Sequence, residues 1–366
     1  MNRRTFLKGT LAVSGGLFVA GRLPAPPRVE AANEAAPKWR TFEVSTKVEV
    51  LDPQGAAKIW LPVPLLTDTD YFKRLGDTWS GNAAGMGNLR DAKYDAGMVY
   101  AEWSGSEKSP TIELTSRFAT RDRRIDFKKP SNAVKEDKEV LKLYLQPTAL
   151  IPTDGIVADN ARVITLGAKR DIDKARAIYE WIVDNTFRDP KVKGCGLGDI
   201  RAMLESRNLG GKCADLNALY VGLARASGIP ARDVYGVRCA TSADFKSLGK
   251  AGDITKAQHC RAEVFLTGYG WVPVDPADVR KVVLEERPEG LSLQDPLVKK
   301  ARAKLFGAWE MNWLAFNYAH DLKLPNSSAK PLPFLMYPQG ETAGGRKDSL
   351  EPESFRYTMT SKEIEV

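Results

Sequence analysis

The chain has 366 residues, a length that predicts two or three domains rather than one. Hydrophobic residues make up 43% and charged residues 27%, as expected for a globular protein that buries a core. The formal net charge is +8, but residues 1–32 carry five basic side chains and one acidic side chain, which leaves about +4 for the remainder. These charges are interspersed, so nucleic-acid binding gains no support, and no apolar run is long enough to predict a mature transmembrane span.

Residues 1–32 have the organisation of an export signal. A basic N-terminal region containing Arg3 and Arg4 precedes a weakly apolar stretch and a region of small residues typical of a signal-peptide cleavage site. The paired arginines, followed by Phe-Leu-Lys, resemble a twin-arginine signal, whose cargo crosses the membrane already folded. We therefore expect a periplasmic or otherwise exported protein. An uncleaved membrane anchor or a chance arginine pair are the alternatives.

Residues 37–130 are expected to form a β-sandwich. Four stretches are rich in β-branched and aromatic residues, as strands are: 39–50, 57–62, 98–103 and 111–120. The stretch 76–82 is rich in glycine and small polar residues and is predicted to be a turn-rich connection. The long connections leave the number of strands open.

The remaining chain divides into three parts. Residues 131–165 are predicted to be a connector with one short charged helix near 134–145. Residues 166–285 begin with helical periodicity and continue with strands, a pattern that predicts an α+β core with an antiparallel sheet. Residues 286–366 are predicted to be an extension whose helix, near 296–305, and terminal strand, 355–364, pack on the core.

Cys213 is the first candidate for chemistry. It follows two glycines and begins a predicted helix, where free N–H groups and the helix dipole lower a thiol pKa from about 8.5 to roughly 3.5–7.5. The same N–H groups can bind the oxyanion of a tetrahedral intermediate. Asp215 opposes a nearby thiolate, whereas Lys212 supports one. A lone cysteine is more often a small buried side chain, so a partner base is needed.

His259 and Asp275 supply that partner and its support. His259 begins a predicted strand that a hairpin turn joins to the strand ending at Asp275. A hairpin loop with an odd residue count, centred on Gly268, places the two side chains on one sheet face, whereas an even loop places them on opposite faces. Asp275 would then hold Nδ1–H of the imidazole and leave the other nitrogen for Cys213. We expect Cys213, His259 and Asp275 to form a catalytic triad.

The segment from about residue 175 to residue 281 resembles the transglutaminase-like fold, a relative of the papain-like cysteine peptidases. In that family a cysteine begins a helix within G-x-C, a histidine begins a strand of the form H-x-x-x-E-V-F/Y-L, and an aspartate lies in G-W-V-P-V-D-P. Cys213, His259 and Asp275 occupy these positions, and the flanking residues match. The resemblance implies a papain-like α+β core with thiol chemistry. The β-sandwich is also similar to the N-terminal module of bacterial members.

One departure bears on the specific activity. Calcium-dependent animal transglutaminases have G-Q-C-W, whereas this chain has Gly-Lys-Cys-Ala around Cys213, which weakens protein crosslinking as its activity. The family also contains peptidases, amidases and inactive members. Hydrolysis of an amide in a peptide or peptidoglycan-type substrate is therefore the first hypothesis. Amine transfer and a non-catalytic cell-envelope scaffold are the alternatives, and the oligomeric state is left open.

The other candidates are weaker. Cys239 and Cys260 are expected on neighbouring strands, where they form either a disulfide or a pair of buried thiols. Cys195 is a loop thiol without an assigned role. With no CxxC spacing and only two histidines, neither a metal site nor a cofactor is expected. Four further residues are expected to have structural roles, with an oxyanion donor or a cleft lining as the alternative for some: Asn208, Trp309, Trp313 and His320.

Overall fold

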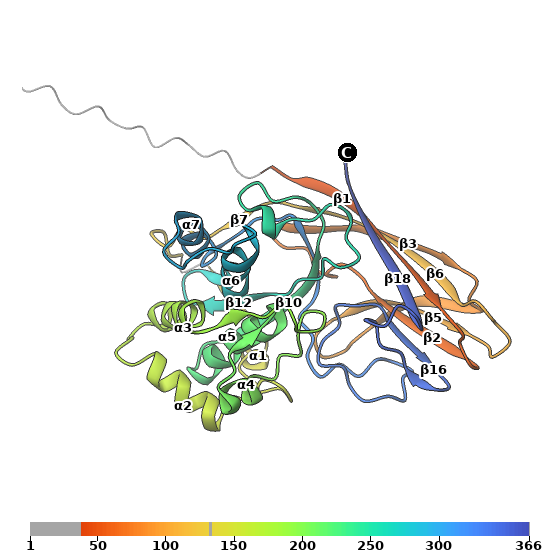
Figure 1. Ribbon diagram of the computed structural model, residues 1–366, viewed down its shortest axis with the longest axis horizontal. Coiled ribbons are helices and arrows are strands. Elements are labelled where there is room, and N and C mark those ends of the chain that lie inside the picture. Colours follow the sequence, from red (N-terminus) through yellow and green to blue (C-terminus); the bar gives the residue numbers. More distant parts are fainter. Residues whose placement is uncertain (1–37, 132–133, 366) are drawn as a thin grey trace, which may run out of the picture. The chain divides into compact units, whose positions relative to one another are not determined.

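The computed structural model describes residues 38–131 and 134–365. The expected export signal, residues 1–32, lies outside the described residues. Within them, no helix combines the length and the apolar character that crossing a membrane requires. In Figure 1 the strands of two large sheets lie together on the right, and the helices lie on the left.

Two antiparallel five-stranded sheets form a sandwich. The first has the order β11–β18–β1–β6–β3, with β1 at Arg40–Val50, β3 at Phe72–Gly81, β6 at Thr111–Thr120, β11 at Gly252–Asp253 and β18 at Phe355–Ile364. The second has the order β17–β16–β2–β5–β4, with β2 at Ala57–Pro62, β4 at Gly85–Arg90, β5 at Gly97–Trp103, β16 at Gln339–Thr342 and β17 at Gly345–Arg346. The expectation of N-terminal strands that form sheets is confirmed.

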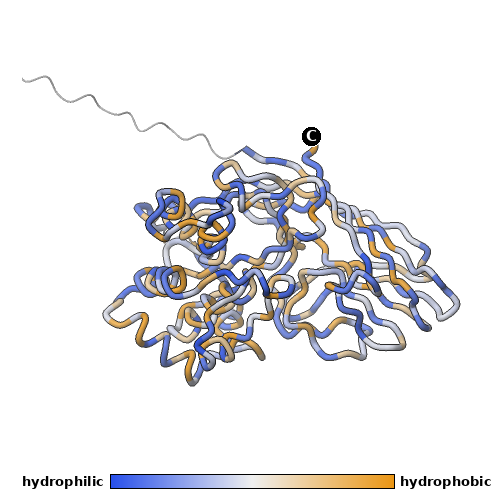
Figure 2. Tube along the Cα trace, in the orientation of Figure 1, coloured by the Kyte–Doolittle hydropathy of each residue, from blue (hydrophilic) through white to orange (hydrophobic). Residues whose placement is uncertain are grey.

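The alternation of buried and exposed side chains along the strands explains why the two sheets pack face to face. Along β1 every second residue is buried, so one face of the strand is apolar, and Figure 2 shows this alternation of hydropathy along the long strands. The buried faces of both sheets meet in one cluster that includes Val48, Ile59, Ala101, Leu114 and Phe355. The apolar area removed from water there stabilises the pairing of the two sheets.

The prediction of a turn-rich connection at residues 76–82 is wrong. Most of that stretch belongs to β3, which pairs with β6 across a bulge between Arg74 and Gly76. Gly76 has φ +121°, a conformation that favours glycine, and this explains its place at the bulge. Because β3 is mostly exposed, the strand carries too few apolar residues for hydrophobic alternation to reveal it.

The core contains the third large sheet, which is antiparallel and has four strands in the order β13–β12–β10–β15. Its strands are β10 at Ala231–Arg238, β12 at Arg261–Leu266, β13 at Gly270–Val274 and β15 at Trp313–Asn317. Two small pairs complete the strands: β7 at Arg123–Arg124 with β14 at Ala308–Trp309, and β8 at Phe187–Arg188 with β9 at Gly210–Gly211.

Helices accompany this sheet in the core. In the described part of the chain they are α1 at Lys138–Leu143, α2 at Gly155–Ile164, α3 at Asp171–Asn185, α4 at Ile200–Ser206, α5 at Cys213–Ala226, α6 at Pro276–Glu285, α7 at Pro296–Lys304 and the 3-10 turn η1 at Lys246–Leu248. Helix α5 is central, since every residue from Cys213 to Arg225 is buried.

The four-stranded sheet is covered on both faces. Leu219 and Leu223 of α5 belong to the cluster that contains Ala262 and Val264 of β12. On the opposite face, Val237 of β10 packs in a cluster with residues of the first sandwich sheet. Burial on both faces accounts for the apolar sequence of these short strands, and it fixes the strand ends that carry the site.

The C-terminal segment takes part in all three large sheets. β15 joins the core sheet, β16 pairs with β2, and β18 pairs with β1 along ten residue positions. Residues from the end of the chain are therefore integral strands of the fold.

Candidate active site

Cys213 is the first residue of α5 and is 4% exposed. Asp215, two residues later, accepts hydrogen bonds from the backbone N–H groups of Leu197, Gly198 and Lys212 at 2.9–3.0 Å. The carboxylate that could have opposed a thiolate is thus bound to backbone donors, and it ties the loop before α4 to the start of α5. Ala214 N–H reinforces this connection by donating to the Cys195 carbonyl at 2.9 Å.

Glycine is required where this loop approaches the helix. Gly196 has φ +93°, and a Cβ placed there would lie 1.9 Å from Oδ2 of Asp215. At Gly211, a Cβ would lie 2.5 Å from the Asp215 Cβ. Since real Cβ atoms do not approach this closely, both positions exclude larger residues. Gly196 and Gly211 therefore serve close packing of the backbone around Asp215, while Gly210 is packed against the ring of Phe187.

The hairpin register confirms the odd loop. Leu266 pairs with Gly270 and Ala262 with Val274, so the loop has three residues centred on Gly268. His259, just before β12, and Asp275, just after β13, consequently project to the same face. Two bonds fix the His259 backbone: its N–H donates to the Gly236 carbonyl, and its carbonyl accepts from Nε1 of Trp313, both at 2.9 Å.

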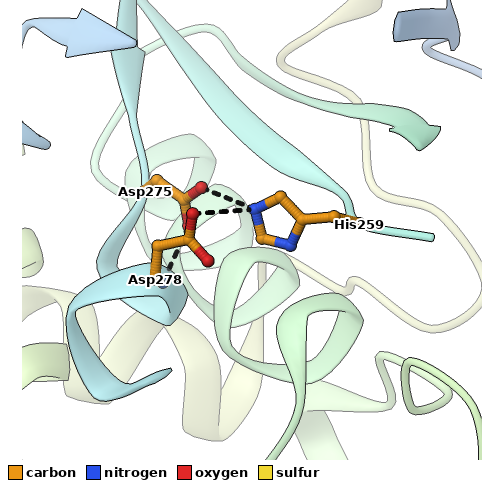
Figure 3. Close-up of side chains that lie close together, drawn as sticks. All are labelled: His259, Asp275 and Asp278. Carbon is orange, nitrogen blue, oxygen red and sulfur yellow. Dashed lines mark hydrogen bonds and ion pairs between the residues drawn. The ribbon is translucent and has the colours of Figure 1, made fainter. Parts of the chain in front are cut away.

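The imidazole of His259 is held through Nε2. This nitrogen lies 2.8 Å from Oδ2 of Asp275, and Figure 3 shows the two side chains facing each other. The expectation that Asp275 would hold Nδ1 is wrong in its choice of nitrogen. Because Nε2 is engaged, Nδ1 is the nitrogen left for Cys213, whose side chain lines the same cleft as His259.

Asp278 is a second carboxylate at the imidazole, and the sequence analysis missed it. Its Oδ2 lies 3.3 Å from Nε2 of His259, and Figure 3 shows both carboxylates at this nitrogen. Asp275 caps α6 by accepting from the Asp278 N–H at 3.0 Å. A signal was present in the sequence, because Asp-Pro-Ala-Asp is a helix start with Pro at the first helical position and Asp at the third.

The two carboxylates raise the pKa of His259. Burial and the guanidinium of Arg238 oppose protonation, but Asp278 and Asp275 outweigh them and raise the pKa of His259 to about 9. Burial likewise opposes ionisation of Asp278, yet Arg238, at 2.5 Å, holds the pKa of Asp278 well below its ordinary value. These pKa shifts favour an imidazolium at neutral pH, with the ionised Asp278 carboxylate beside its Nε2.

Three thiols meet at the start of α5. Hydrogen bonds from Cys195 and Cys260, and then the bond and charge of His259, overcome burial and lower the pKa of Cys213 well below its ordinary value. The neighbouring Cys213 sulfur, together with burial, raises the pKa of Cys195. Cys195 also lies 3.3 Å from the Gln258 carbonyl. The arrangement favours a Cys213 thiolate paired with a His259 imidazolium.

A cleft of about 610 Å³ opens in front of Cys213 and His259. Its walls come from the loop before α4, from residues 249–258, and from the C-terminal segment. Tyr337, Leu350 and Tyr357 contribute an apolar wall from that segment. Local sequence patterns do not predict this contribution, since Tyr357 reaches the cleft through the pairing of β18 with β1.

The chain is similar to known proteins in sequence and in fold. Residues 158–276 match the model of the transglutaminase-like superfamily. A protein of Haemophilus influenzae, described as uncharacterised, is 33% identical over 356 residues, and the alignment spans 91% of this chain and 95% of that protein. The chain belongs to the transglutaminase-like superfamily.

Solved structures extend the similarity of fold beyond the transglutaminase-like core. The structure of a proposed cysteine protease from Cytophaga hutchinsonii matches with a TM-score of 0.50 at 16% identity, covering 89% of this chain and 98% of that one. The periplasmic domain of TgpA from Pseudomonas aeruginosa matches with a TM-score of 0.33 at 14% identity, covering 64% of this chain and 89% of that domain. The first match includes sandwich and core together.

One cluster in the transglutaminase-like core has the composition of a metal site. Ligand atoms of His259, Asp275 and Asp278 lie within 4.8 Å of one another. Arg238 is paired with Asp278, and Arg261 lies 3.8 Å from Asp275, so two buried cations already balance these carboxylates. A divalent cation would have to compete with both guanidinium groups. The donor set fits a hydrogen-bonded histidine better than a cation site.

The remaining residues considered from the sequence do not belong to the group formed by Cys213, His259 and Asp275. All four cysteines are free and buried, so Cys239 and Cys260 are two buried thiols. Asn208 accepts from the Gly210 N–H at 3.1 Å, which is a turn contact. His320 is buried near Asp233, with its Nε2 3.2 Å from Oδ2. Trp309 and Trp313 pack edge to face in the core.

Proposed function

We propose that the protein is a cysteine-dependent acyl-transfer enzyme that hydrolyses an amide bond through a thioacyl intermediate. The observation that carries the proposal is that Cys213 and His259 line one cleft, with Nε2 of the imidazole bonded to a buried carboxylate. This pairing supplies a nucleophile and a proton carrier in a fixed geometry. The fold match to a proposed cysteine protease agrees with the same chemistry.

The reaction follows from the positions of the groups. The Cys213 thiolate attacks the carbonyl carbon, and the oxyanion forms at the N-terminus of α5, where the positive end of the helix dipole stabilises it. His259 gives its proton to the leaving amine, and the C–N bond breaks to leave a thioester. His259 then takes a proton from water as the water attacks the thioester. The carboxylic acid leaves, and the thiolate–imidazolium pair is restored.

Water is the proposed acyl acceptor. The cleft is lined by several polar and cationic groups, and such a lining does not exclude water from the thioester. Amine transfer remains the alternative product of the same intermediate. Analysis of products formed from peptidoglycan fragments, with and without an added primary amine, distinguishes a free carboxylic acid from a new amide.

Export is part of the proposal. The basic start, apolar stretch and small-residue exit of residues 1–32 support translocation, with the paired arginines directing a folded cargo. Replacing Arg3 and Arg4 by lysine is expected to retain the protein in the cytoplasm. Cell fractionation and immunoblotting measure this, and unchanged export of the variant would contradict the assigned route.

The test of the catalytic assignment is selective alkylation. Iodoacetamide at neutral pH is expected to modify Cys213 faster than the other three cysteines, because only that thiol has a lowered pKa. Mass spectrometry of peptides maps the labelled positions. His259→Ala is expected to slow labelling of Cys213 strongly, since the imidazolium that stabilises the thiolate is lost.

A matched control separates chemistry from folding. His320→Ala removes the other histidine, which is also buried but lies outside the cleft, and should leave the labelling of Cys213 unchanged. Equal labelling of all four thiols, or an unaffected rate in His259→Ala, would overturn the proposal. It would favour instead the non-catalytic scaffold with this fold.

A further inference from the structure

The cleft in front of Cys213 is lined by cations and by no carboxylate. Seven of its described lining residues are lysine or arginine, and none is aspartate or glutamate. Across the whole chain, basic and acidic residues number 54 and 46, so an exclusively basic set of this size is not the chain's general composition. The sign of the potential in the cleft therefore depends on which of these cations are already neutralised.

Four of the seven cations are paired with carboxylates that do not themselves line the cleft. The ion pairs are Arg238 with Asp278, Arg188 and Lys281 with Glu285, and Lys193 with Asp348 and Glu351. Four cations therefore face four carboxylates, and this set has no net charge. The thiolate and the imidazolium cancel in the same way.

Three lysines have no such partner. In the described part of the chain, no ion pair involves Lys212, Lys250 or Lys256. Asp253 lies outside the lining; hydrogen bonds from Thr255, and then the charges of Lys250 and Lys256, lower the pKa of its carboxyl. Even with Asp253 counted against the three lysines, the cleft retains a positive excess.

The unpaired lysines reach the cleft from two segments of the chain, one that leads to Cys213 and one that leads to His259. Lys212 immediately precedes the nucleophile, at the cap of α5, where the helix dipole adds to its charge. Lys250 and Lys256 belong to the segment that leads to His259. Leu350 and Tyr357 supply apolar surface to the same cleft. A substrate with anionic groups flanking the reacting carbonyl and an aliphatic chain fits this lining.

We infer that the cleft selects an anionic acyl substrate, a short peptide-like chain that carries carboxylates beside the amide to be cleaved. This inference rests on the proposed function and specifies its substrate class. Attraction by three unpaired lysines raises the local concentration of an anion, and the effect weakens with ionic strength. A neutral chain gains no such advantage.

Two alkylating reagents of different charge measure the potential at Cys213 directly. Iodoacetate is an anion and iodoacetamide is neutral, and both react with the thiolate. The ratio of their rate constants at Cys213 is therefore independent of the thiol pKa. We expect this ratio to exceed the ratio measured for free cysteine, and to fall toward it when the salt concentration is raised.

The variant Lys250→Gln/Lys256→Gln removes two of the unpaired charges. The ratio of iodoacetate to iodoacetamide rates is expected to fall about threefold to tenfold. The matched control is Lys108→Gln/Lys299→Gln, which removes the same charge from two exposed lysines outside the cleft. In the control the ratio should stay within about twofold of the unmodified protein, because distant surface charges are screened.

A peptide pair extends the test from reagent to substrate class. Acetyl-Glu-Ala-Glu-Ala amide at millimolar concentration should protect Cys213 from iodoacetamide, and the glutamine counterpart should not. Equal protection by both peptides, no protection by either, or a ratio unchanged in Lys250→Gln/Lys256→Gln overturns the inference while leaving the proposed function intact. Failure of iodoacetamide to prefer Cys213 overturns the proposed function itself, and the inference with it.

Discussion

Asn217 of α5 donates a hydrogen bond from Nδ2 to Oδ1 of Asp275, at 3.2 Å, and a second to the Cys260 carbonyl at 2.9 Å. Asn217 lies one helical turn after Cys213 and is completely buried. The helix that carries the nucleophile is thus joined directly to the carboxylate that orients the base. The separation of sulfur and imidazole is set through this amide.

Asn217→Ala is expected to slow alkylation of Cys213 and to reduce the free energy of unfolding by about 1–3 kcal/mol, because a buried carboxylate oxygen and a carbonyl each lose a donor. Asn317→Ala is the matched control. Asn317 is equally buried and donates to the Leu335 carbonyl at 2.7 Å, away from the cleft. Similar loss of stability in both variants, with slower alkylation only in Asn217→Ala, assigns Asn217 a positioning role. Slower alkylation in both would contradict it.

Asp278→Asn is expected to lower the pKa of His259 from about 9 toward its ordinary value of about 6.5. The reason is that the charge of Asp278 is the largest single cause that raises this pKa, while Asp275 adds both its charge and a hydrogen bond. Proton NMR of the imidazole follows the titration, and His320→Gln assigns the signal, since the chain has two histidines. A pKa that stays near 9 would show that Asp275 alone sets the protonation of His259.

The pH dependence of hydrolysis and of alkylation should differ above pH 9. Cys213 loses its proton well below its ordinary pKa, and His259 keeps its proton up to about 9, so the ion pair exists between the two values. As the pH rises through about 9, the leaving amine loses its proton donor and amide hydrolysis falls. The thiolate persists, so the iodoacetamide rate does not fall. A parallel decline of both rates would contradict this assignment of roles.

Cys195 is predicted to set the acidity of its neighbour. Its hydrogen bond is the largest contribution that lowers the pKa of Cys213, so Cys195→Ala should move the pH midpoint of Cys213 alkylation upward. Cys195→Ser keeps a donor and should restore part of the shift. Cys239→Ala is the control, because that buried thiol does not line the cleft. No shift in Cys195→Ala would assign the low pKa to His259 and the helix alone.

The sequence predicted the parts of the site that depend on short-range geometry. The shared face of His259 and Asp275 follows from strand period and loop length, and the register confirms it. The position of Cys213 follows from glycines and helical periodicity. The nitrogen that faces Asp275 depends on the rotation of the imidazole, which no pattern in the sequence encodes.

Long-range pairing accounts for what the sequence did not predict. β18 matches its predicted span, but its partner β1 lies some three hundred residues earlier, and no local signal specifies that pairing. The lining of the cleft by Tyr357 follows from the same pairing, and that by Tyr337 from the equally distant pairing of β16 with β2. β3 escaped prediction because an exposed strand needs little apolar surface when its backbone is paired.

Glu263, within the matched strand motif, is predicted to stabilise the fold rather than to act on substrate. It is completely buried on β12, where it contacts Arg123 and lies 2.7 Å from Arg232. These guanidinium groups outweigh burial and lower the pKa of Glu263. Glu263→Gln leaves two buried cations without their anion, so the free energy of unfolding should fall by about 3–5 kcal/mol.

Glu363→Gln is the control for that measurement. Its pair with Arg40, at 2.7 Å, lies at the surface, so the loss should be about 0–1 kcal/mol. Urea denaturation followed by tryptophan fluorescence gives both values. Because Glu263 is not among the residues that line the cleft, alkylation of Cys213 in the folded Glu263→Gln protein should keep its rate. A reduced rate without a loss of stability would instead connect this buried ion pair to the reacting thiol.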